Sequence, residues 1–230
     1  MLTVKNIHTY YGKSYVLQGI SLEVKEGEIV SILGRNGVGK TTLLRSIMGL
    51  TPPRLGEICF RGQEIQRLSP HLIPRLGIGY VPQGRRIFPR LTVLENLKTA
   101  LVKGKIAKGS FDEVFEYFPR LAERGNQPGG TLSGGEQQML AIGRALIAHP
   151  QMVILDEPTE GLMPSLVAMV RESIQNMNRQ KGVAILLVEQ NLETALAISN
   201  RMYLMEKGNI TLEKKVAEIS KEELLRVLCI

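Results

Sequence analysis

The chain has 230 residues, 43% of them hydrophobic, and a formal net charge of +7. This size favours one domain with a sizeable core, and the longest apolar runs, such as 183–188, are far too short to cross a bilayer. The Lys and Arg residues are scattered and no Trp is present, which argues against a nucleic-acid surface. Cys59 and Cys229 are far apart and indicate no metal site. No basic-then-apolar leader precedes Val4, so we expect a protein that reaches membranes only through a partner.

The N-terminal part is expected to be rich in strands. Residues 2–7 and 16–24 alternate polar and apolar side chains, as half-buried strands do. Between them, 10–14 form a predicted turn with two aromatic rings. Tyr11, beside the glycine of that turn, is our candidate for stacking on a purine base, although a core or surface tyrosine fits the same pattern.

The stretch 34–42 reads Gly-Arg-Asn-Gly-Val-Gly-Lys-Thr-Thr and matches the phosphate-loop pattern G-x-x-x-x-G-K-S/T. It follows a strand-like apolar run, 28–33, and opens a helix-like segment, 41–48. The glycines allow successive N–H groups to curl round an anion, and the helix N-terminus adds positive charge. We expect Lys40 to reach the β- and γ-phosphates of a nucleotide and the Thr41 hydroxyl to bind Mg²⁺. The candidate nucleotide contacts in this loop are Gly34, Arg35, Asn36, Gly37, Gly39, Lys40, Thr41 and Thr42.

The segment after this loop mixes strands and polar loops. The predicted elements are strands over 56–60 and 78–81 and a short helix over 69–76 that Pro74 interrupts. Gln83 then opens an Arg-rich polar loop. The segment 103–109, rich in Gly and Lys, is expected to be a solvated loop.

Helix starts dominate the middle of the chain. Thr92 with Glu95, and Ser110 with Glu113, each have the spacing of a capping box. We therefore predict a mostly helical lobe over about 84–150, inserted between strand-rich portions at 1–83 and 151–230.

A second anion-binding cradle is predicted at 131–138. Ser133 stands at the N-cap position of a helix that continues through Ala148, and Gly134 and Gly135 leave backbone N–H groups uncovered. A plain Ser-capped helix fits the same residues.

Paired carboxylates follow the apolar run 152–155. Such a run is typical of a buried central strand of a parallel sheet, and ligands of α/β sheets bind at the carboxyl ends of these strands. Asp156 is our candidate for holding Mg²⁺, and Glu157 for orienting or deprotonating an attacking water. Acids at a strand end also commonly cap turns, but the phosphate loop in the same chain favours the catalytic interpretation.

The C-terminal part repeats the strand–helix alternation. A second buried strand over 183–188 ends in Glu189 and Gln190. A helix over 191–198 follows it. Strands at 202–205 and 210–213 flank a hairpin-like turn. A last helix is predicted to begin at Ser220.

In order and spacing, these motifs resemble those of the ATP-binding subunit of ATP-binding cassette (ABC) transporters over essentially the whole chain. The stretch 34–42 resembles Walker A, Gln83 the Q-loop, and 132–136 the signature sequence. Asp156 and Glu157 resemble the end of Walker B and the catalytic glutamate. The resemblance implies an α/β P-loop NTPase with a mixed-sheet core, an antiparallel β subdomain and a helical subdomain, as one ABC ATPase domain over 1–230.

The resemblance also implies how the two cradles work together. Two such subunits dimerise head to tail and enclose two ATP molecules, each between Walker A of one subunit and the signature of the other. On this basis Ser133, Gly134, Gly135 and Glu136 are expected to contact nucleotide. Gln83 is expected at the Mg²⁺ site, linking the phosphates to a helical lobe that receives a short helix of a permease.

Two positions depart from the general pattern of the family. Met163 stands where many members have an aspartate that crosses the dimer interface, and Met cannot supply that carboxylate. Gln190 stands where many have a switch histidine. Its amide can still donate to a γ-phosphate but carries no titratable proton, so we expect a positioning role in catalysis.

Other residues point to a subgroup. The stretches 81–86, 160–162 and 188–191 resemble importers of branched-chain amino acids and, in close relatives, urea or short amides; 33–39 and 158–161 lean towards urea. The resemblance implies ATP hydrolysis coupled to solute import. It implies a second ATPase subunit, identical or different, two integral membrane permeases and, indirectly, an extracytoplasmic solute-binding protein. This chain would be the smaller ATPase, cytoplasmic and peripheral on the inner face of the membrane.

Two other functions stay open at this point. A soluble, non-transport ABC ATPase acting on nucleic acid or ribosomes is suggested by the net charge of +7. A degenerate cassette that binds ATP only as a switch is suggested by Met163 and Gln190, while Glu157 argues against it.

Overall fold

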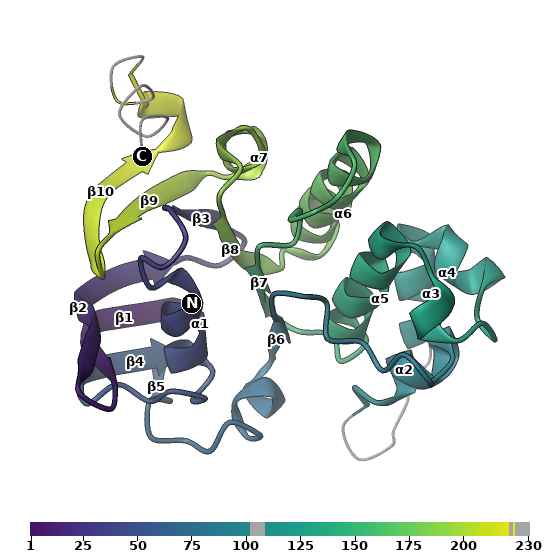
Figure 1. Cartoon of the computed structure of the whole chain (residues 1–230), viewed down its shortest axis with the longest axis horizontal. Helices are drawn as coiled ribbons and strands as arrows, with labels where there is room; N and C mark the ends of the chain where they lie inside the picture. Colours follow the sequence, from purple (N-terminus) through teal and green to yellow (C-terminus); the bar gives the residue numbers. More distant parts are fainter. Residues whose placement is uncertain (102–108, 221–222, 224–230) are drawn as a thin grey trace.

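The computed structural model describes residues 1–101, 109–220 and 223 (Figure 1). Most of the basic segment 103–109, all of the helix expected after Ser220 except residue 223, and Cys229 lie outside these residues. Within the described ranges, no helix has the length and apolarity that a membrane-spanning segment needs.

A six-stranded mixed sheet forms the centre of the molecule. Its order is β10-β9-β3-β8-β7-β6, with β10 antiparallel to β9 and the other neighbours parallel. Every residue of β3, β7 and β8 is buried, as expected for strands covered on both faces. In the order of the sheet, the strands are β10 (Asn209–Lys215), β9 (Arg201–Glu206), β3 (Ile29–Leu33), β8 (Ala184–Glu189), β7 (Met152–Asp156) and β6 (Ile78–Val81).

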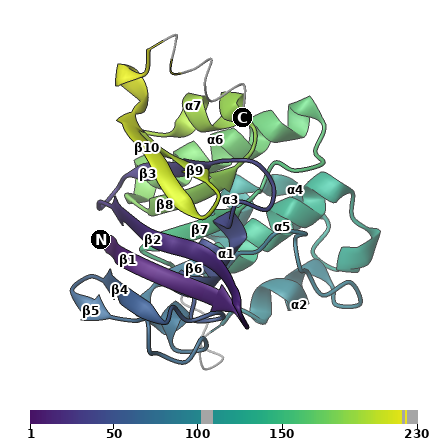
Figure 2. The same cartoon turned by 60° about the vertical axis from the view of Figure 1, so that its left-hand side comes forward.

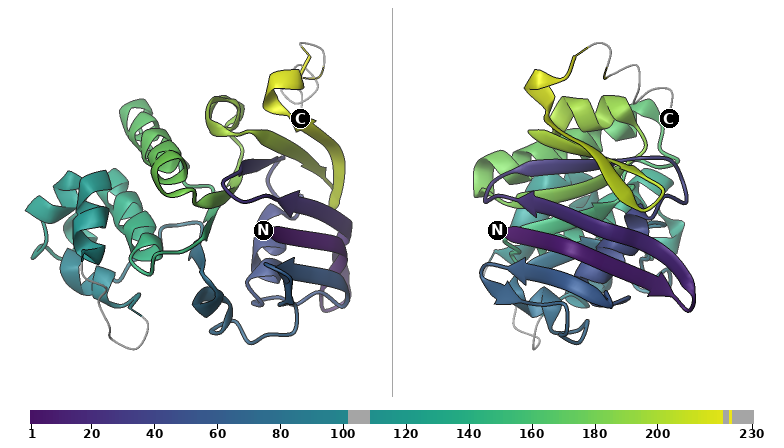
Figure 3. Two further views of the ribbon diagram at one scale, coloured as in Figure 1. Left: turned by 180° about the vertical axis from the view of Figure 1, so that it is seen from behind. Right: turned by 90° about the vertical axis from the view of Figure 1, so that its left-hand side faces the viewer.

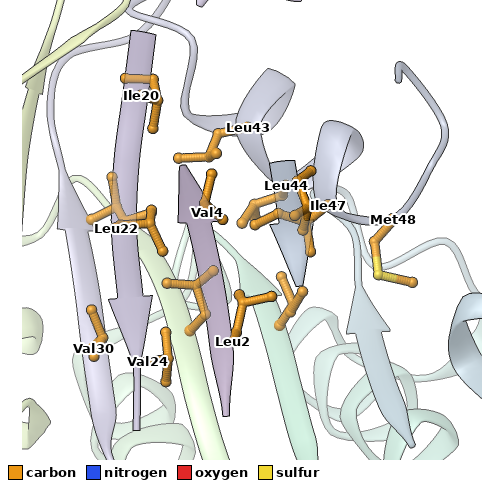
Figure 4. Close-up of a cluster of buried hydrophobic side chains, with 14 of the residues drawn as sticks. Leu2, Val4, Ile20, Leu22, Val24, Val30, Leu43, Leu44, Ile47 and Met48 are labelled. Carbon is orange, nitrogen blue, oxygen red and sulfur yellow. The ribbon is translucent and has the colours of Figure 1, made fainter. Parts of the chain in front are cut away.

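An antiparallel sheet, β2-β1-β4-β5, lies beside the central one. Figure 4 shows apolar side chains of its strands packed with those of α1 (Lys40–Ile47), including Val4, Leu22 and Leu43. This shared core fixes the start of α1, and with it the end of the glycine-rich loop, relative to both sheets. The strands are β2 (Ser14–Val24), β1 (Leu2–Tyr11), β4 (Leu55–Phe60) and β5 (Gln63–Glu64).

A group of helices lies on the other side of β6 and β7 (Figures 1 and 2). Its apolar side chains, such as Val93, Leu121 and Leu140, belong to one buried cluster with Val153 and Leu187 of the central sheet. The helices are α2 (Val93–Lys98), α3 (Ser110–Tyr117), α4 (Pro119–Glu123) and α5 (Gly134–Leu146); α6 (Pro164–Lys181) and α7 (Leu192–Ile198) follow in the chain. The predicted α/β P-loop architecture, with its mixed sheet, antiparallel β part and helical part, is confirmed.

Several local predictions can be compared with this fold. The hairpin of β9 and β10 is confirmed. So is the capping box of α2, where Thr92 Oγ1 accepts the Glu95 N–H at 3.2 Å and the Glu95 carboxylate accepts the Thr92 N–H at 2.8 Å.

Two local predictions are wrong. The helix expected over 69–76 is only a 3₁₀ turn, Ile73–Leu76, because Pro74 supplies no N–H for a regular α-helix. The N-cap predicted at Ser110 is misplaced, because Ser110 is already the first helical residue and Gly109, with φ +88°, takes the N-cap position.

Candidate functional site

The glycine-rich loop connects β3 to α1, and its backbone needs glycine at two places. A Cβ on Gly34 would lie 2.4 Å from the carbonyl oxygen of Met205. Gly39 has φ +110°, and a Cβ there would lie 2.9 Å from the Met205 methyl group. The loop is therefore pressed against β9, and its shape depends on the absence of side chains.

Lys40 is buried inside this loop, with 4% of its surface exposed. Its Nζ donates to the carbonyl oxygens of Gly34 at 2.7 Å and Arg35 at 3.0 Å, and lies 3.2 Å from Glu157 Oε1. The ammonium group is thus held at the centre of the loop, with a carboxylate from another strand beside it.

The Glu157 carboxylate is where four separate chain segments meet. Besides Lys40, it accepts hydrogen bonds from Gln83 Nε2 at 3.2 Å and Gln190 Nε2 at 2.8 Å. Gln190 Nε2 also lies 2.6 Å from Asn36 Oδ1 in the loop. These residues come together because β3, β8, β7 and β6 are parallel neighbours, so their carboxyl ends reach the same edge.

Asp156 and Thr41 form a polar pair next to this carboxylate. The Thr41 hydroxyl donates to Asp156 Oδ1 at 3.2 Å, while Asp156 Oδ2 is buried without a hydrogen-bond partner among the described residues. Burial raises the pKa of Asp156 from 3.8 to about 6; the hydrogen bond from Thr41 opposes this rise, and the charge of Glu157 adds to it. A buried carboxylate oxygen in need of a partner, beside a hydroxyl, is a donor set that suits a hard cation such as Mg²⁺.

Gln83 lies on the loop that follows β6. Its Nε2 donates to Glu157 and, at 2.9 Å, to Glu160 Oε2. The amide therefore faces the catalytic candidates, and its expected part in a metal site stays a prediction.

A cavity of about 180 Å³ opens over these groups. It is lined by Val16, Asn36, Gly37, Gly39, Lys40, Thr41, Thr42, Gln83 and Glu157. Val16, on β2, was missed by the sequence analysis because nothing in a strand pattern shows which residue will face a distant loop. Tyr11 does not line this cavity; it is 45% exposed at the end of β1, with its hydroxyl 3.3 Å from Thr51 Oγ1.

The signature residues start α5. Ser133 is the exposed N-cap, and its Oγ accepts the Glu136 N–H at 3.4 Å. The Glu136 carboxylate accepts from the N–H of Ser133 at 2.9 Å and its hydroxyl at 2.8 Å, and pairs with Arg124 at 2.9 Å. Burial would raise the pKa of Glu136, but the hydrogen bonds from Ser133 and the charge of Arg124 lower it. Gly134 and Gly135 form the first turn, with Gly135 buried against Leu166.

The two cradles are not joined within the chain. Figures 1 and 3 show α1 and α5 on opposite sides of β6 and β7, and no signature residue lines the cavity over the glycine-rich loop. Ser133, exposed at the start of α5, therefore does not line the phosphate-loop cavity of its own chain.

Glu189 is a site residue to which the sequence analysis assigned no role. It is 2% exposed at the end of β8, and its carboxylate accepts from the Thr159 N–H at 3.1 Å and hydroxyl at 2.7 Å. Burial raises its pKa. The carboxylate connects the turn after Glu157 to the end of β8, directly before Gln190. Its position directly after a continuous apolar run is the one signal that marks it.

Comparisons with known proteins agree on one family. Residues 17–160 match the family described as "ABC transporter". The high-affinity branched-chain amino acid transport ATP-binding protein BraG of Pseudomonas aeruginosa is 45% identical over 92% of this chain and 91% of its own. The probable branched-chain amino acid transport ATP-binding protein LivF of Archaeoglobus fulgidus is 37% identical over 100% of this chain and 98% of its own. The lipopolysaccharide export system ATP-binding protein LptB of Escherichia coli is 34% identical over 96% of this chain and 93% of its own.

Solved structures show the same fold. A dimeric post-hydrolysis state of the ATP-binding cassette MJ0796 bound to ADP and Pi has a TM-score of 0.84 and 28% identity, covering 94% of this chain and 99% of its own. A nucleotide-free ATP-binding cassette from an ABC transporter has a TM-score of 0.87 and 28% identity, covering 100% and 95%.

Proposed function

The chain belongs to the ABC transporter family and is an ATP-binding, ATP-hydrolysing subunit of it; from this premise we propose that it energises the import of branched-chain amino acids. The similarity to BraG, at 45% identity, supports import of these amino acids over lipopolysaccharide export, since LptB is 34% identical over a comparable length. Urea and short amides are the alternative substrates, and ATP hydrolysis by the complete transporter distinguishes them from leucine.

The observation that carries the mechanism is the Glu157 carboxylate, held by donors from three other segments at the mouth of the phosphate loop. We propose that Glu157 orients the attacking water and takes its proton, as a carboxylate within hydrogen-bond reach can do. Gln190 and Asn36, which contact each other, hold this carboxylate and the loop in one arrangement. Because Gln190 has no titratable proton, its part is positioning and donation to the γ-phosphate.

The loop itself is proposed to bind the phosphates. The backbone N–H groups of its glycines and of the first turn of α1 form the cradle, and Lys40 is the cation for the β- and γ-phosphates. Arg35 and Thr42 complete the loop contacts, and Tyr11 is proposed to stack on the adenine.

The Thr41 hydroxyl and Asp156 are the residues that would hold Mg²⁺, with the amide oxygen of Gln83 as a further ligand. The ion, when bound, neutralises phosphate charge that develops during transfer. Asp156 would gain a partner for its buried Oδ2.

We further propose the division of the chain into a nucleotide-binding core, 1–83 and 151–230, and a helical subdomain over about 84–150. The separation of Ser133 from its own phosphate loop supports a composite site, in which Ser133, Gly134 and Gly135 contact the nucleotide of a second ATPase subunit. Glu136 supports that surface by holding Ser133.

The proposed partners are a second ATPase subunit, two integral membrane permeases and, indirectly, an extracytoplasmic solute-binding protein. The chain would then lie in the cytoplasm against the inner face of the membrane. A cavity of about 380 Å³ between core and helical lobe, lined among others by Tyr80, Ala141 and Pro150, offers a mostly apolar surface for a short helix of a permease.

The test is ATP hydrolysis by the complete transporter, purified from membranes and reconstituted with its binding protein. We expect the rate to rise when the binding protein is loaded with leucine and to stay low with urea. An unchanged rate on assembly would contradict the transport function, whereas stimulation by urea alone would move the substrate to the urea class. A gel-shift experiment at low and moderate salt tests the nucleic-acid alternative, which predicts salt-sensitive binding.

A further inference from the structure

The loop after Gln83 has an unusual backbone. Gly84, Arg85 and Arg86 all have positive φ, at +77°, +65° and +50°. Two consecutive non-glycine residues in the left-handed region are strained and persist only where surrounding contacts hold them. Here the Arg86 N–H donates to the Gly84 carbonyl oxygen at 2.7 Å, and Arg144 Nη1 donates to the Arg86 carbonyl oxygen at 2.7 Å.

This backbone directs the Arg85 side chain to the start of α5. A Cβ on Gly134 would lie 3.0 to 3.2 Å from three atoms of the Arg85 guanidinium group. The guanidinium can approach the helix this closely because position 134 has no side chain. Arg85 Nη1 also donates to Gln137 Oε1 at 3.3 Å.

Gln137 extends the contact to the residues before Ser133. Its Nε2 donates to the carbonyl oxygen of Leu132 at 3.2 Å and to that of Gly129 at 3.4 Å. One side-chain amide therefore joins Arg85, on the loop of Gln83, to the backbone segment that ends at Ser133.

Stabilisation of α5 alone does not account for this arrangement. The helix start is already capped by Ser133 and Glu136, and a cation beside a helix N-terminus meets the positive end of the helix dipole, which is unfavourable. The contact makes sense as a connection between two loops, since Gln83, two residues before Arg85, contacts both Glu157 and Glu160.

We propose that Arg85 is a positioning residue. Through its contacts with Gly134 and Gln137, Arg85 makes the position of the Ser133 hydroxyl depend on the position of the loop that follows Gln83. The proposal rests on the function proposed above, in which Gln83 is a ligand of the Mg²⁺ at the nucleotide of its own subunit and Ser133 contacts the nucleotide of the partner. A subunit that lacks the Arg85 guanidinium should still bind ATP at its phosphate loop. In the closed dimer, however, its Ser133 and Gly134 would be misplaced relative to the nucleotide of the partner.

The test compares Arg85→Ala, Gln137→Ala and the double variant in the reconstituted transporter, with Arg90→Ala as control. Arg90 is exposed on the same loop, so its removal changes the charge equally. We expect Arg85→Ala to lower kcat about tenfold, equal to about 1.4 kcal/mol, while KM for ATP changes by less than about twofold. Arg85→Lys should restore little, because an ammonium group lacks the planar fork of guanidinium.

The double variant should be no slower than Arg85→Ala, because both changes remove the same connection. The proposal is overturned if Arg85→Ala behaves like Arg90→Ala, if the two effects are fully additive, or if KM alone changes. Should Arg85→Ala prove unstable in a thermal melt, Gln137→Ala tests the same connection from the helix side. A native transporter without stimulated hydrolysis would count against the proposed function instead.

Discussion

Glu157 lies directly after β7 with φ +51°, a left-handed conformation that residues other than glycine seldom adopt. The conformation turns its carboxylate towards Lys40, Gln83 and Gln190, which together hold it at the phosphate loop. Local strain at a residue with several fixed partners is typical of functional sites. At this scale the proposed chemistry therefore depends on one side chain whose neighbours come from distant parts of the chain.

The change Glu157→Gln keeps the size of the side chain but removes its ability to accept a proton. We expect the hydrolysis rate to fall by about 10²- to 10⁴-fold, while ATP still binds and an ATP-bound dimer accumulates. Phosphate release under single-turnover conditions and size-exclusion chromatography with ATP measure the two effects. If native and variant chains were equally inactive, the ATP-switch interpretation suggested by Met163 and Gln190 would be favoured.

Among the elements, the hairpin of β9 and β10 supports the phosphate loop from the side. At its tip, the Gly208 N–H donates to the Val38 carbonyl oxygen at 2.9 Å, and its own carbonyl accepts the Gln18 N–H at 2.8 Å. A Cβ on Gly208 would lie 2.2 Å from the Val16 carbonyl oxygen. The hairpin thus connects the loop to β2, and this contact requires glycine.

We expect Gly208→Ala to destabilise the protein by about 2 kcal/mol or more and to weaken ATP binding, because the backbone must shift next to Val38. The neighbouring Lys207 is exposed with φ +45°, so Lys207→Asn, which tolerates this conformation, serves as control and should be neutral or stabilising by up to about 1 kcal/mol. Urea unfolding and nucleotide titration measure both variants. Equal ATP affinity in Gly208→Ala and native protein would refute the link to the loop.

The start of α5 allows a prediction about pH. Glu136 has a lowered pKa in the folded chain, so the stability that its charge contributes is present above its usual value of 4.5 and is lost as pH falls below it. Glu136→Gln should therefore cost about 1 kcal/mol at neutral pH, and the difference from native should shrink in acid. Unfolding of both proteins at about pH 7 and about pH 3 provides the comparison, and a difference independent of pH would contradict it.

At the scale of the whole molecule, the two proposed nucleotide cradles, at the starts of α1 and α5, lie on opposite sides of β6 and β7 (Figure 1). The phosphate loop has its acids and amides within one chain, whereas none of the signature residues 132–136 lines the cavity over that loop. A head-to-tail pair of subunits would place each Ser133 against the loop of the other, as the proposed composite site requires.

Mixed dimers of two differently tagged copies test this arrangement. All copies carry Glu157→Gln. When a copy with Lys40→Ala pairs with a copy with Ser133→Arg, the intact phosphate loop of the second copy faces the intact Ser133 of the first. This dimer keeps one complete composite site, and we expect it to trap ATP. Placing both changes in one copy and pairing it with a copy that carries neither leaves no complete site, so that dimer should trap none. Equal trapping in the two pairings would show that each chain binds ATP by itself.

The sequence by itself determined the features that depend on near neighbours: the phosphate loop, the capping box at Thr92, the buried strands that end in Asp156 and in Glu189, and the hairpin of β9 and β10. Their signals are spacing and periodicity, which act over a few residues. Local chemistry also has limits, since it misplaced the cap of α3 by one residue and predicted a helix at 69–76 where a 3₁₀ turn forms.

Only the tertiary structure decided which strand ends meet. The order β3-β8-β7-β6 brings Gln190, Glu157 and Gln83 to one edge, and no local pattern encodes an order of strands that are distant in sequence. The same holds for Val16 in the cavity wall, for Glu189 holding Thr159, and for Arg85 against Gly134. These contacts arise from the packing of the sheets and the helical lobe, because the free energy of burying apolar surface, unlike sequence spacing, is a property of the whole assembled core.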